Sequence, residues 1–418
     1  MQWLNRAMLR LPTENTLDRE EKIMAEWVKR KISDIGTVVG GATPSTKKPE
    51  NYEDGKIAWI TPKDLSTFSS RYIEHGERNI TEIGLKSCST QLLPPNTILF
   101  SSRAPIGYVA IAANEVCTNQ GFKSVIPNEN TDPLFLFYLL KYNKDKIEGM
   151  GSGTTFKEVS GNTMKNIVVN VPTDKKVQEK MAAILGSIDD KIEENERINN
   201  NLLEQALTMY ATQFATLDRN GCIGDYCSVK SGFAFKSSWW TTAGVKVIKI
   251  GSINQDNLNL LECSYVDADK IDKAKDFKVN AGDLLIAMTG ATIGKFAMVP
   301  YSSELLLVNQ RVGKFFLGNK PVEKLPFIYC TLKQPEVYGE VVNRGQGSAQ
   351  PNISASDIMS IPCVIPSQDA INDFNGTAQP LFDLIISNQR ENQQLSEVRD
   401  TLLPKLLSGE LNVSDIDL

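Results

Sequence analysis

The chain has 418 residues, of which 41% are hydrophobic and 23% charged, a balance typical of globular proteins and a length that allows two or three domains. It contains one histidine, His75, and seven cysteines without a CxxC pair. This composition argues against a zinc site and against sites built on several histidines, and it indicates reduced thiols in the cytoplasm. No apolar run is long enough for a membrane helix and the N-terminus lacks a signal-peptide pattern, so we expect a cytoplasmic protein without membrane contact.

The net charge of −5 is unevenly distributed along the chain. Residues 27–172 and 217–366 carry net charges of +3 and +2, whereas residues 173–216 and 367–418 carry −3 and −6. The overall acidity therefore does not exclude nucleic-acid binding by the two mildly basic segments.

The first half of the chain predicts a lead, a globular domain and a long helix, in that order. Residues 1–26 fit either an amphipathic helix or a flexible lead, and the pattern leaves both open. Residues 27–172 alternate short apolar runs such as IAWITPKDL with Gly- and Pro-rich turns, and FLFYLLKYNKDKI predicts a helix among them, which together indicate a compact α+β domain. Residues 173–216 predict one long spacer helix, because no proline and a single glycine interrupt Asp174 to about Phe214.

The second half repeats this plan. Residues 217–366 again combine strand-like runs such as VKVIKIGSI with turns, and FIYCTLKQPEVYGEVV predicts a helix, so we expect a second α+β domain. Residues 367–418 contain a second long spacer helix, from Asp369 to about Leu403, and a C-terminal tail. Gly376 and Pro380 predict a kink or break near the start of this helix.

An internal duplication accounts for the repeated plan. GSGTTFKEVSGNTMKNIVVNVP aligns without gaps with GQGSAQPNISASDIMSIPCVIP at an offset of 194 residues. Upstream matches follow in the same order, with Asn119-Gln120 against Asn309-Gln310 at an offset of 190. A smoothly drifting offset is what loop insertions produce in a duplicated unit. The identities of the gapless stretch are Gly151/Gly345, Gly153/Gly347, Ser160/Ser354, Ile167/Ile361 and Pro172/Pro366.

The two long helices share a coiled-coil pattern. Apolar residues recur at alternate spacings of three and four from Ile371 to Leu402 and from Met181 to Met209, and each seam carries two central asparagines. Buried asparagines fix register when they meet a polar partner. An antiparallel pair of helices would place the asparagines opposite one another; they are Asn195, Asn199, Asn388 and Asn392. A parallel pair could match them too, but it would place both globular domains at the same end. The alternative is two unrelated amphipathic helices, each packed on its own domain.

The predicted architecture is thus α+β, with two globular domains separated by two long antiparallel helices that form a coiled coil, related by a pseudo-two-fold repeat. This layout resembles the specificity subunits of type I restriction–modification systems. GGATPSTKKPENYEDGKIAWITPKDL and SGFAFKSSWW are similar to the openings of that family's target recognition domains. GATIGKFAMV, VNQRV, KIEENERINNNLLEQA and LLPKLLSGEL also resemble the family, and the likeness extends from Trp27 to the C-terminus.

The resemblance implies a non-catalytic DNA-binding subunit. Each target recognition domain would read one half of a split, asymmetric site on double-stranded DNA, and the helices would set the gap between the halves. Two modification subunits, which hold S-adenosylmethionine and methylate adenine, would dock around the helices. ATP- and Mg-dependent restriction subunits would complete the complex, and this chain itself would bind no cofactor or metal.

The chain's own motifs do not indicate catalysis. GATIGK has too few residues between its glycines for a phosphate-binding loop, and Phe296 stands where Ser or Thr must hold magnesium. LPPN is not the Asn-Pro-Pro-aromatic signature of an adenine methyltransferase, and no clustered carboxylates followed by a lysine indicate a nuclease.

Candidate DNA contacts are polar, basic or aromatic residues in turns, where hydroxyls and amines reach phosphates or base edges. An ordinary solvated turn, or for Arg103 a structural salt bridge, is the alternative interpretation. The paired glycines before two of these loops fit either a nearby ligand or a tight turn. The candidates are Thr43, Ser45, Thr46, Lys47, Lys48, Arg103, Thr155 and Lys157 in the first domain, and Phe235, Lys236, Ser237, Gln346, Gln350 and Asn352 in the second.

Two further functions remain open from the sequence. One is the specificity subunit of a type II-like bipartite system in which methylase and nuclease share one partner chain. The other is a coiled-coil adaptor whose duplicated domains bind proteins.

Overall fold

The computed structural model describes residues 26–66, 68–103, 105–153, 157–345 and 351–413. The chain divides into two compact units, Met1–Gly186 with Thr401–Leu418, and Ser187–Asp400. The predicted lead lies outside the described residues except for Glu26. Among the described residues, no helix is long and apolar enough to cross a membrane.

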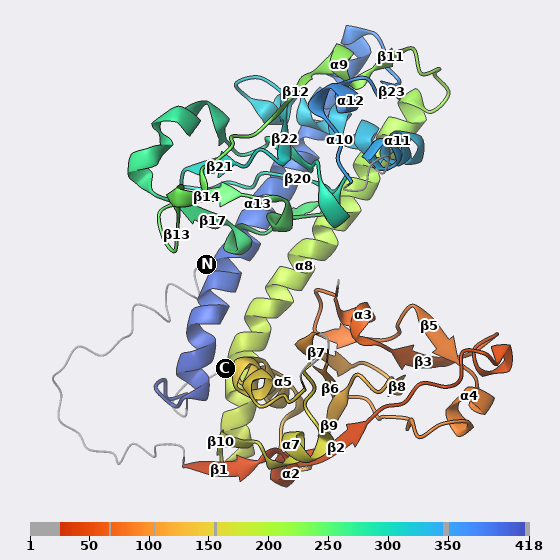
Figure 1. Ribbon diagram of the computed structural model, residues 1–418, viewed down its shortest axis with the longest axis vertical. Coiled ribbons are helices and arrows are strands. Elements are labelled where there is room, and N and C mark those ends of the chain that lie inside the picture. Colours follow the sequence, from red (N-terminus) through yellow and green to blue (C-terminus); the bar gives the residue numbers. More distant parts are fainter. Residues whose placement is uncertain (1–25, 67, 104, 154–156, 346–350, 414–418) are drawn as a thin grey trace. The chain divides into compact units, whose positions relative to one another are not determined.

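The first unit contains a domain built on two small sheets (Figure 1). One sheet has the strand order β2-β9-β6-β7-β4 and the other has the order β5-β3-β8, in which β3 pairs parallel with β8. The strands are β1 (Trp27–Lys31), β2 (Gly36–Gly40), β3 (Ile57–Ile60), β4 (Tyr72–Ile73), β5 (Arg78–Ile80), β6 (Ile98–Ser102), β7 (Ile106–Ala112), β8 (Val116–Thr118), β9 (Lys123–Pro127) and β10 (Val168–Pro172). The helices are α2 (Ile32–Ile35), α3 (Pro62–Leu65), α4 (Glu82–Lys86), α5 (Pro133–Tyr142), α6 (Lys144–Gly149) and α7 (Gly161–Asn166).

The second unit contains a domain whose central strands repeat the order of the first, while its edge strands differ. Its sheets have the orders β12-β22-β19-β20 and β13-β17-β14-β21-β18, and β14 pairs parallel with β21 as β3 does with β8. The strands are β11 (Gly221–Cys222), β12 (Ser228–Ser231), β13 (Trp240–Thr241), β14 (Val245–Ile248), β15 (Ile253–Asn254), β16 (Asn257–Leu258), β17 (Ser264–Val266), β18 (Lys278–Val279), β19 (Leu284–Ala287), β20 (Phe296–Met298), β21 (Leu306–Val308), β22 (Val312–Phe316) and β23 (Pro362–Cys363). The helices are α9 (Ile223–Tyr226), α10 (Leu325–Lys333), α11 (Pro335–Gly345) and α12 (Ala355–Met359).

The repeated residues of the sequence have matching structural tasks. Ser160 accepts a hydrogen bond from Thr163 N at the start of α7, and Ser354 accepts one from Asp357 N at the start of α12. The Ile32 amide donates to the Ile167 carbonyl at 3.0 Å, and the Ile223 amide donates to the Ile361 carbonyl at 3.1 Å. Because both the order of the central strands and these contacts recur, the predicted duplicated α+β fold is confirmed.

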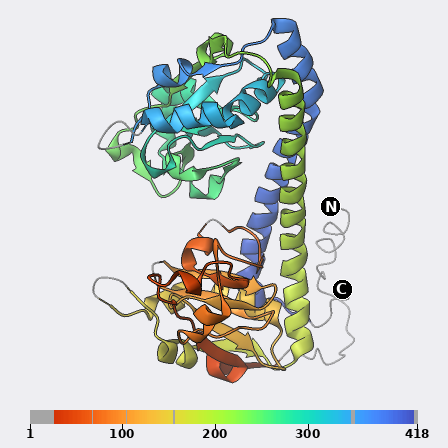
Figure 2. The same cartoon turned by 90° about the vertical axis from the view of Figure 1, so that its right-hand side faces the viewer.

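Two helices of 40 residues follow the domains: α8 (Lys175–Phe214) and α13 (Gln368–Leu407). Within the second unit they lie side by side (Figures 1 and 2) and run antiparallel. Asn195 Nδ2 donates to Asn392 Oδ1 at 2.8 Å, and Asn388 Nδ2 donates to Asn199 Oδ1 at 2.8 Å. The predicted antiparallel pairing of the asparagines is therefore confirmed.

Of the predicted kink or break in the second helix, the break is wrong, because α13 continues through Gly376 and Pro380, whereas the kink stays a prediction. Proline cannot donate to the carbonyl four residues earlier, which here belongs to Gly376. Both residues are exposed, so water can satisfy that carbonyl and the helix continues.

The buried stripe of each helix is wider than a coiled-coil seam. On α8, Ala206, Tyr210 and Phe214 are buried against the core of the second domain, whereas the predicted seam residues Leu202 and Met209 are only partly buried. The spacing pattern could not reveal this, because residues that face a domain and residues that face a partner helix are equally apolar.

Candidate nucleic-acid interface

The loop after β2 presents the first group of candidate residues on a supported backbone. Asn51 Nδ2 donates to the Ser45 carbonyl at 3.0 Å, Tyr52 Oη donates to the Pro44 carbonyl at 2.6 Å, and Trp59 Nε1 donates to the Ala42 carbonyl at 3.1 Å. These bonds hold the loop from its inner side and leave a row of polar side chains exposed. The exposed residues are Thr43, Ser45, Thr46, Lys47 and Lys48.

A tight turn after β8 lies beside this loop. The Asn119 amide donates to the Ile60 carbonyl at 3.1 Å, and Asn119 Oδ1 accepts from the Gly121 amide at 2.8 Å. The turn exposes Gln120, whose Oε1 accepts a hydrogen bond from Thr43 Oγ1. The turn is thus tied both to the buried strand β3 and to the candidate loop.

The same turn reaches the other candidates of the first domain. The Ser102 amide donates to the Gly121 carbonyl at 2.7 Å, and the Val159 amide donates to the Ser102 carbonyl at 2.9 Å. Arg103 therefore stands opposite Glu158 in an isolated antiparallel bridge, one residue from the exposed Lys157. No ion pair of Arg103 occurs among the described residues. Thr155 lies outside the described residues.

The second domain has the corresponding turn after β21. The Asn309 amide donates to the Ile248 carbonyl at 3.0 Å, and Asn309 Oδ1 accepts from the Arg311 amide at 3.3 Å. The turn exposes Gln310 and Arg311. The Met288 amide donates to the Arg311 carbonyl at 3.0 Å, which joins the turn to β19 and the segment that follows it.

Asn352 lies close to this second turn. The Ile353 amide donates to the Met288 carbonyl at 2.9 Å, and Asn352 forms an isolated antiparallel bridge with Thr289. Its side chain is exposed. Gln346 and Gln350 lie outside the described residues.

The opening of the second domain is aromatic where that of the first is polar. Phe235 packs edge to face on Phe233, with ring centroids 5.0 Å apart, and contacts Trp239 and Trp240. Lys236 Nζ lies 6.0 Å from the Trp239 ring, and Ser237 is exposed beside it. Phe235 is thus half-buried in an aromatic cluster, while Lys236 and Ser237 remain accessible to a partner.

The glycines before the candidate loops have a packing reason. A Cβ on Gly345 would lie 2.1 Å from Ile293 Cδ1, and one on Gly151 would lie 3.2 Å from Ile106 Cδ1. Ile106 and Ile293 are themselves a matched pair of the duplication. These two glycines therefore make room for an isoleucine in each domain, which is a packing reason apart from a tight turn or a nearby ligand.

Sequence reasoning missed Gln120, Gln310 and Arg311 as candidate contacts. The two Asn-Gln pairs were visible as part of the repeat, but they follow buried strands and not the Gly- and Pro-rich stretches in which contacts were sought. An exposed polar residue repeated directly after a fully buried strand was the available signal.

The described residues contain no group of three or more His, Cys, Asp or Glu side chains that could hold a metal ion. Burial raises the pKa of the Cys117 thiol to about 11, and those of Cys227 and Cys363 to about 12, so these thiols stay protonated at neutral pH. They are packing residues and not nucleophiles.

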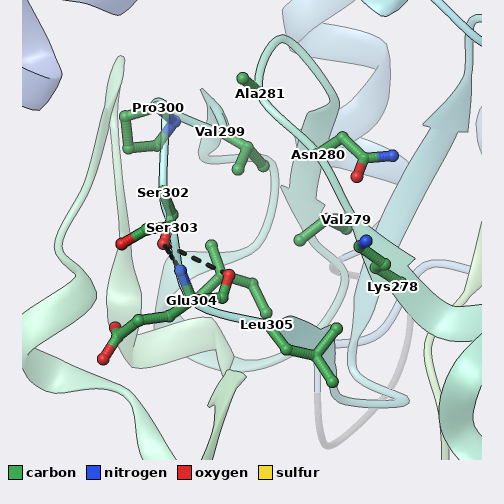
Figure 3. A pocket seen from close by; sticks show the side chains of 11 residues that line it. Lys278, Val279, Asn280, Ala281, Val299, Pro300, Ser302, Ser303, Glu304 and Leu305 are labelled. Carbon is green, nitrogen blue, oxygen red and sulfur yellow. Dashed lines mark hydrogen bonds between the residues drawn. The ribbon is translucent and has the colours of Figure 1, made fainter.

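A cavity of about 290 Å³ lies beside β18 and β21 (Figure 3). Its charged lining residues are Lys278 and Glu304, and Glu304 is paired with Lys246 at 2.5 Å. The remaining lining is Asn280, aliphatic residues and the turn in which the Glu304 amide donates to Ser302 Oγ at 3.1 Å. The cavity offers no arrangement of acid, base and nucleophile.

Comparison with known proteins agrees with the duplicated architecture. The chain matches the type I restriction modification DNA specificity domain twice, over residues 24–204 and 219–397. It is 33% identical to the type I restriction enzyme MjaIX specificity subunit of Methanocaldococcus jannaschii, over 94% of this chain and 96% of that protein. It is 20% identical to the MjaVIII specificity subunit of the same organism, over 95% of each chain.

The fold is also similar to that of a solved structure. The S subunit of a type I restriction–modification system from M. genitalium aligns with a TM-score of 0.53 and 18% identity, over 93% of this chain and 98% of that one. With the two family matches and the similarity to MjaIX along almost the whole chain, this protein belongs to the type I restriction–modification specificity subunits and is a non-catalytic subunit of that family.

Proposed function

We propose that each domain reads one half of a split, asymmetric site on double-stranded DNA, and that α8 and α13 set the gap between the halves. The observation that carries this proposal is the matched turn. In both domains an exposed glutamine follows a buried strand, and the candidate contacts Arg103 and Lys157 or Asn352 are hydrogen-bonded around it. Polar and basic side chains on a rigid backbone are what phosphate and base-edge contacts need.

The difference between the domains supports an asymmetric target. Thr43 and two lysines border the turn of the first domain, whereas Arg311 and the aromatic cluster border that of the second. Direct readout depends on which donors and acceptors face the base edges. Two surfaces that differ in this way select different half-sites.

The helices supply the spacer and a surface for partners. Forty helical residues extend for ~60 Å, more than one turn of DNA at ~34 Å. Two modification subunits dock on the exposed faces of these helices and supply S-adenosylmethionine and adenine methylation, and restriction subunits supply the ATP-driven nuclease. No catalytic step falls to this chain.

The test is to express the chain with its methyltransferase subunit and to map methylated adenines by sequencing. We expect one split motif, and replacement of residues 27–172 by the recognition domain of another specificity subunit should change one half of that motif and leave the other half and the gap unchanged. An unchanged motif after the exchange would contradict modular reading. A catalytically inactive methyltransferase should abolish the modification, which locates the chemistry in the partner.

The same material separates the two alternatives. A protein adaptor would bind DNA weakly or with little salt dependence, whereas phosphate contacts make affinity fall steeply with salt. A type II-like system would place methylase and nuclease in one partner chain, which purification of the complex reveals.

A further inference from the structure

We infer that Gln120 and Gln310 are phosphate contacts that set each domain's register on the duplex, and that neither glutamine reads a base. The inference rests on the proposed DNA-reading function and adds a role for two residues within it. The geometry of the turn is repeated in the two domains, its surroundings are not, and the exposed amide matches a phosphate.

The turn is held in the same way in both domains. Each asparagine before the glutamine donates its amide to the last residue of the neighbouring parallel strand and caps the turn with its side chain. A glycine backbone packs directly against each turn. A Cβ on Gly41 would lie 2.1 Å from the Thr118 carbonyl oxygen, and one on Gly232 would lie 2.3 Å from the Val308 carbonyl oxygen. The two glutamines therefore project from equivalent, closely confined backbones.

The residues around the turns differ. Gly121 follows Gln120, whereas Arg311 follows Gln310, and Arg103 of the first domain has Gly290 as its counterpart in the second. If the half-sites differ, a side chain kept in both domains fits what the half-sites have in common, which is the phosphate backbone. The residues that change are the ones suited to base edges.

The exposed amide of Gln120 fits that acceptor. Thr43 Oγ1 donates to Gln120 Oε1, which fills one acceptor position of the oxygen, and the NH2 group of this exposed side chain supplies two donors. A phosphate offers only acceptors, so these donors match it. Because glutamine is neutral, the contact adds affinity without releasing a counterion.

The experiment measures DNA binding and methylation by the full chain with its methyltransferase subunit. Gln120→Ala and Gln310→Ala should each weaken binding about tenfold or more, which is the size of a hydrogen bond to a charged group. The loss should be equal on target and non-target DNA, the methylated motif should stay the same, and the salt dependence of binding should not change. Gln120→Glu keeps the shape but should weaken binding further, because a carboxylate faces the phosphate.

Controls separate this inference from folding and from the proposed function. Asn130→Ala removes an exposed side-chain amide in the loop between β9 and α5, beyond the end of β9 that lies away from the turn, and this variant should bind as the wild type does. Thermal unfolding should be unchanged in all these variants, because the altered side chains are exposed. The inference would be overturned if a glutamine variant changed a base of the motif, lost affinity for target DNA alone or bound with unchanged affinity. In each of these cases the wild-type complex would still methylate one split motif. A wild-type complex without a split motif would instead overturn the proposed function.

Discussion

The two domains share a frame, which is the set of central strands and their pairing, and differ at their rims, which are the loops that carry the candidate contacts. The central strands have the same order, β2-β9-β6-β7 in the first domain and β12-β22-β19-β20 in the second, and both domains have the parallel pair. The edge strands differ, with β4 in the first domain and β13 and β18 in the second, and each domain closes with a strand pair, β1 with β10 and β11 with β23. The rims differ, with hydroxyls and lysines in the first domain and Phe233, Trp239 and Trp240 in the second. The duplicated domains therefore keep the central backbone and differ in the exposed side chains of the candidate loops.

The domains also differ in how each contacts the helix that follows it. In the first unit, Arg71 Nη1 donates to the Gly186 carbonyl of α8 at 3.4 Å. In the second unit, the hairpin of β15 and β16 reaches α13, where Gln389 Nε2 donates to the Asp256 carbonyl at 3.0 Å. Asp256 also pairs with Lys333 at 2.5 Å and accepts from Tyr329 Oη. The hairpin is thus an attachment particular to the second domain.

The shared frame predicts that the domains respond alike to one change. Gly41→Ala and Gly232→Ala each force a Cβ against a backbone carbonyl, and we expect each to lower the free energy of unfolding by about 3 kcal/mol. Urea denaturation of the two variants measures this. Gly40→Ala is the matched control, because no atom lies within 4 Å of the new Cβ. A large loss in one domain and none in the other would break the structural equivalence.

The asparagine pairs predict a different response, because they belong to the helices and to neither rim. Asn388→Leu should cost about 2 kcal/mol, since it leaves the buried Asn199 Oδ1 without its donor. The double variant Asn199→Leu and Asn388→Leu should regain most of that loss but weaken the choice of register. Thermal unfolding measures the first effect, and a changed gap in the methylated motif reports the second. Additive losses in the double variant would contradict direct pairing.

Sequence patterns predicted the frame well because its signals are local or repeated. Ser160 and Ser354 are identical because each caps a helix, and the central asparagines match because they meet in the antiparallel pair. These positions obey rules of spacing and hydrogen bonding that operate within a few residues or across one seam.

The rest could not be predicted because it depends on packing over long sequence distances. Pro380 indicated a break, but its exposed position lets water take the free carbonyl. Gln120 was not singled out, because its position beside Thr43 arises from the parallel pairing of β3 with β8. No local sequence pattern indicates that β3 pairs with β8. The wide buried stripe of α8 similarly depends on the domain packed against it.

The difference between the rims predicts unequal contributions to the salt dependence of DNA binding. Removing both Lys47 and Lys48 in a double alanine variant should reduce the slope of log affinity against log salt concentration by roughly 2, because each phosphate-neutralising lysine accounts for about 0.9. Lys236→Ala in the second domain should reduce it by about 1. Titrations at several salt concentrations measure both. If the wild type and the double variant had equal slopes, Lys47 and Lys48 would not contact DNA phosphates.

The smallest effect concerns an ion pair in which the domains again differ. Asp283 of the second domain is 1% exposed and accepts from Lys314 Nζ at 2.6 Å. The side chain of Glu158 in the first domain is 42% exposed and lies 3.3 Å from Lys123 Nζ. Burial raises the pKa of Asp283 above 3.8, and the hydrogen bonds from Lys314 and the Asn280 amide offset this only in part.

A raised pKa means that the folded state holds the Asp283 proton more tightly than the unfolded state does. Its stabilising contribution is therefore complete below pH 3.8 and is lost as the pH rises through the folded-state pKa. Relative to Asp283→Asn, which cannot titrate, the wild type should lose stability as the pH rises through that window, and the difference should be constant above it. Urea denaturation of both proteins between about pH 3 and 7 measures the difference. A wild type that gains stability over the variant in that window would show that Lys314, and not burial, controls the carboxylate.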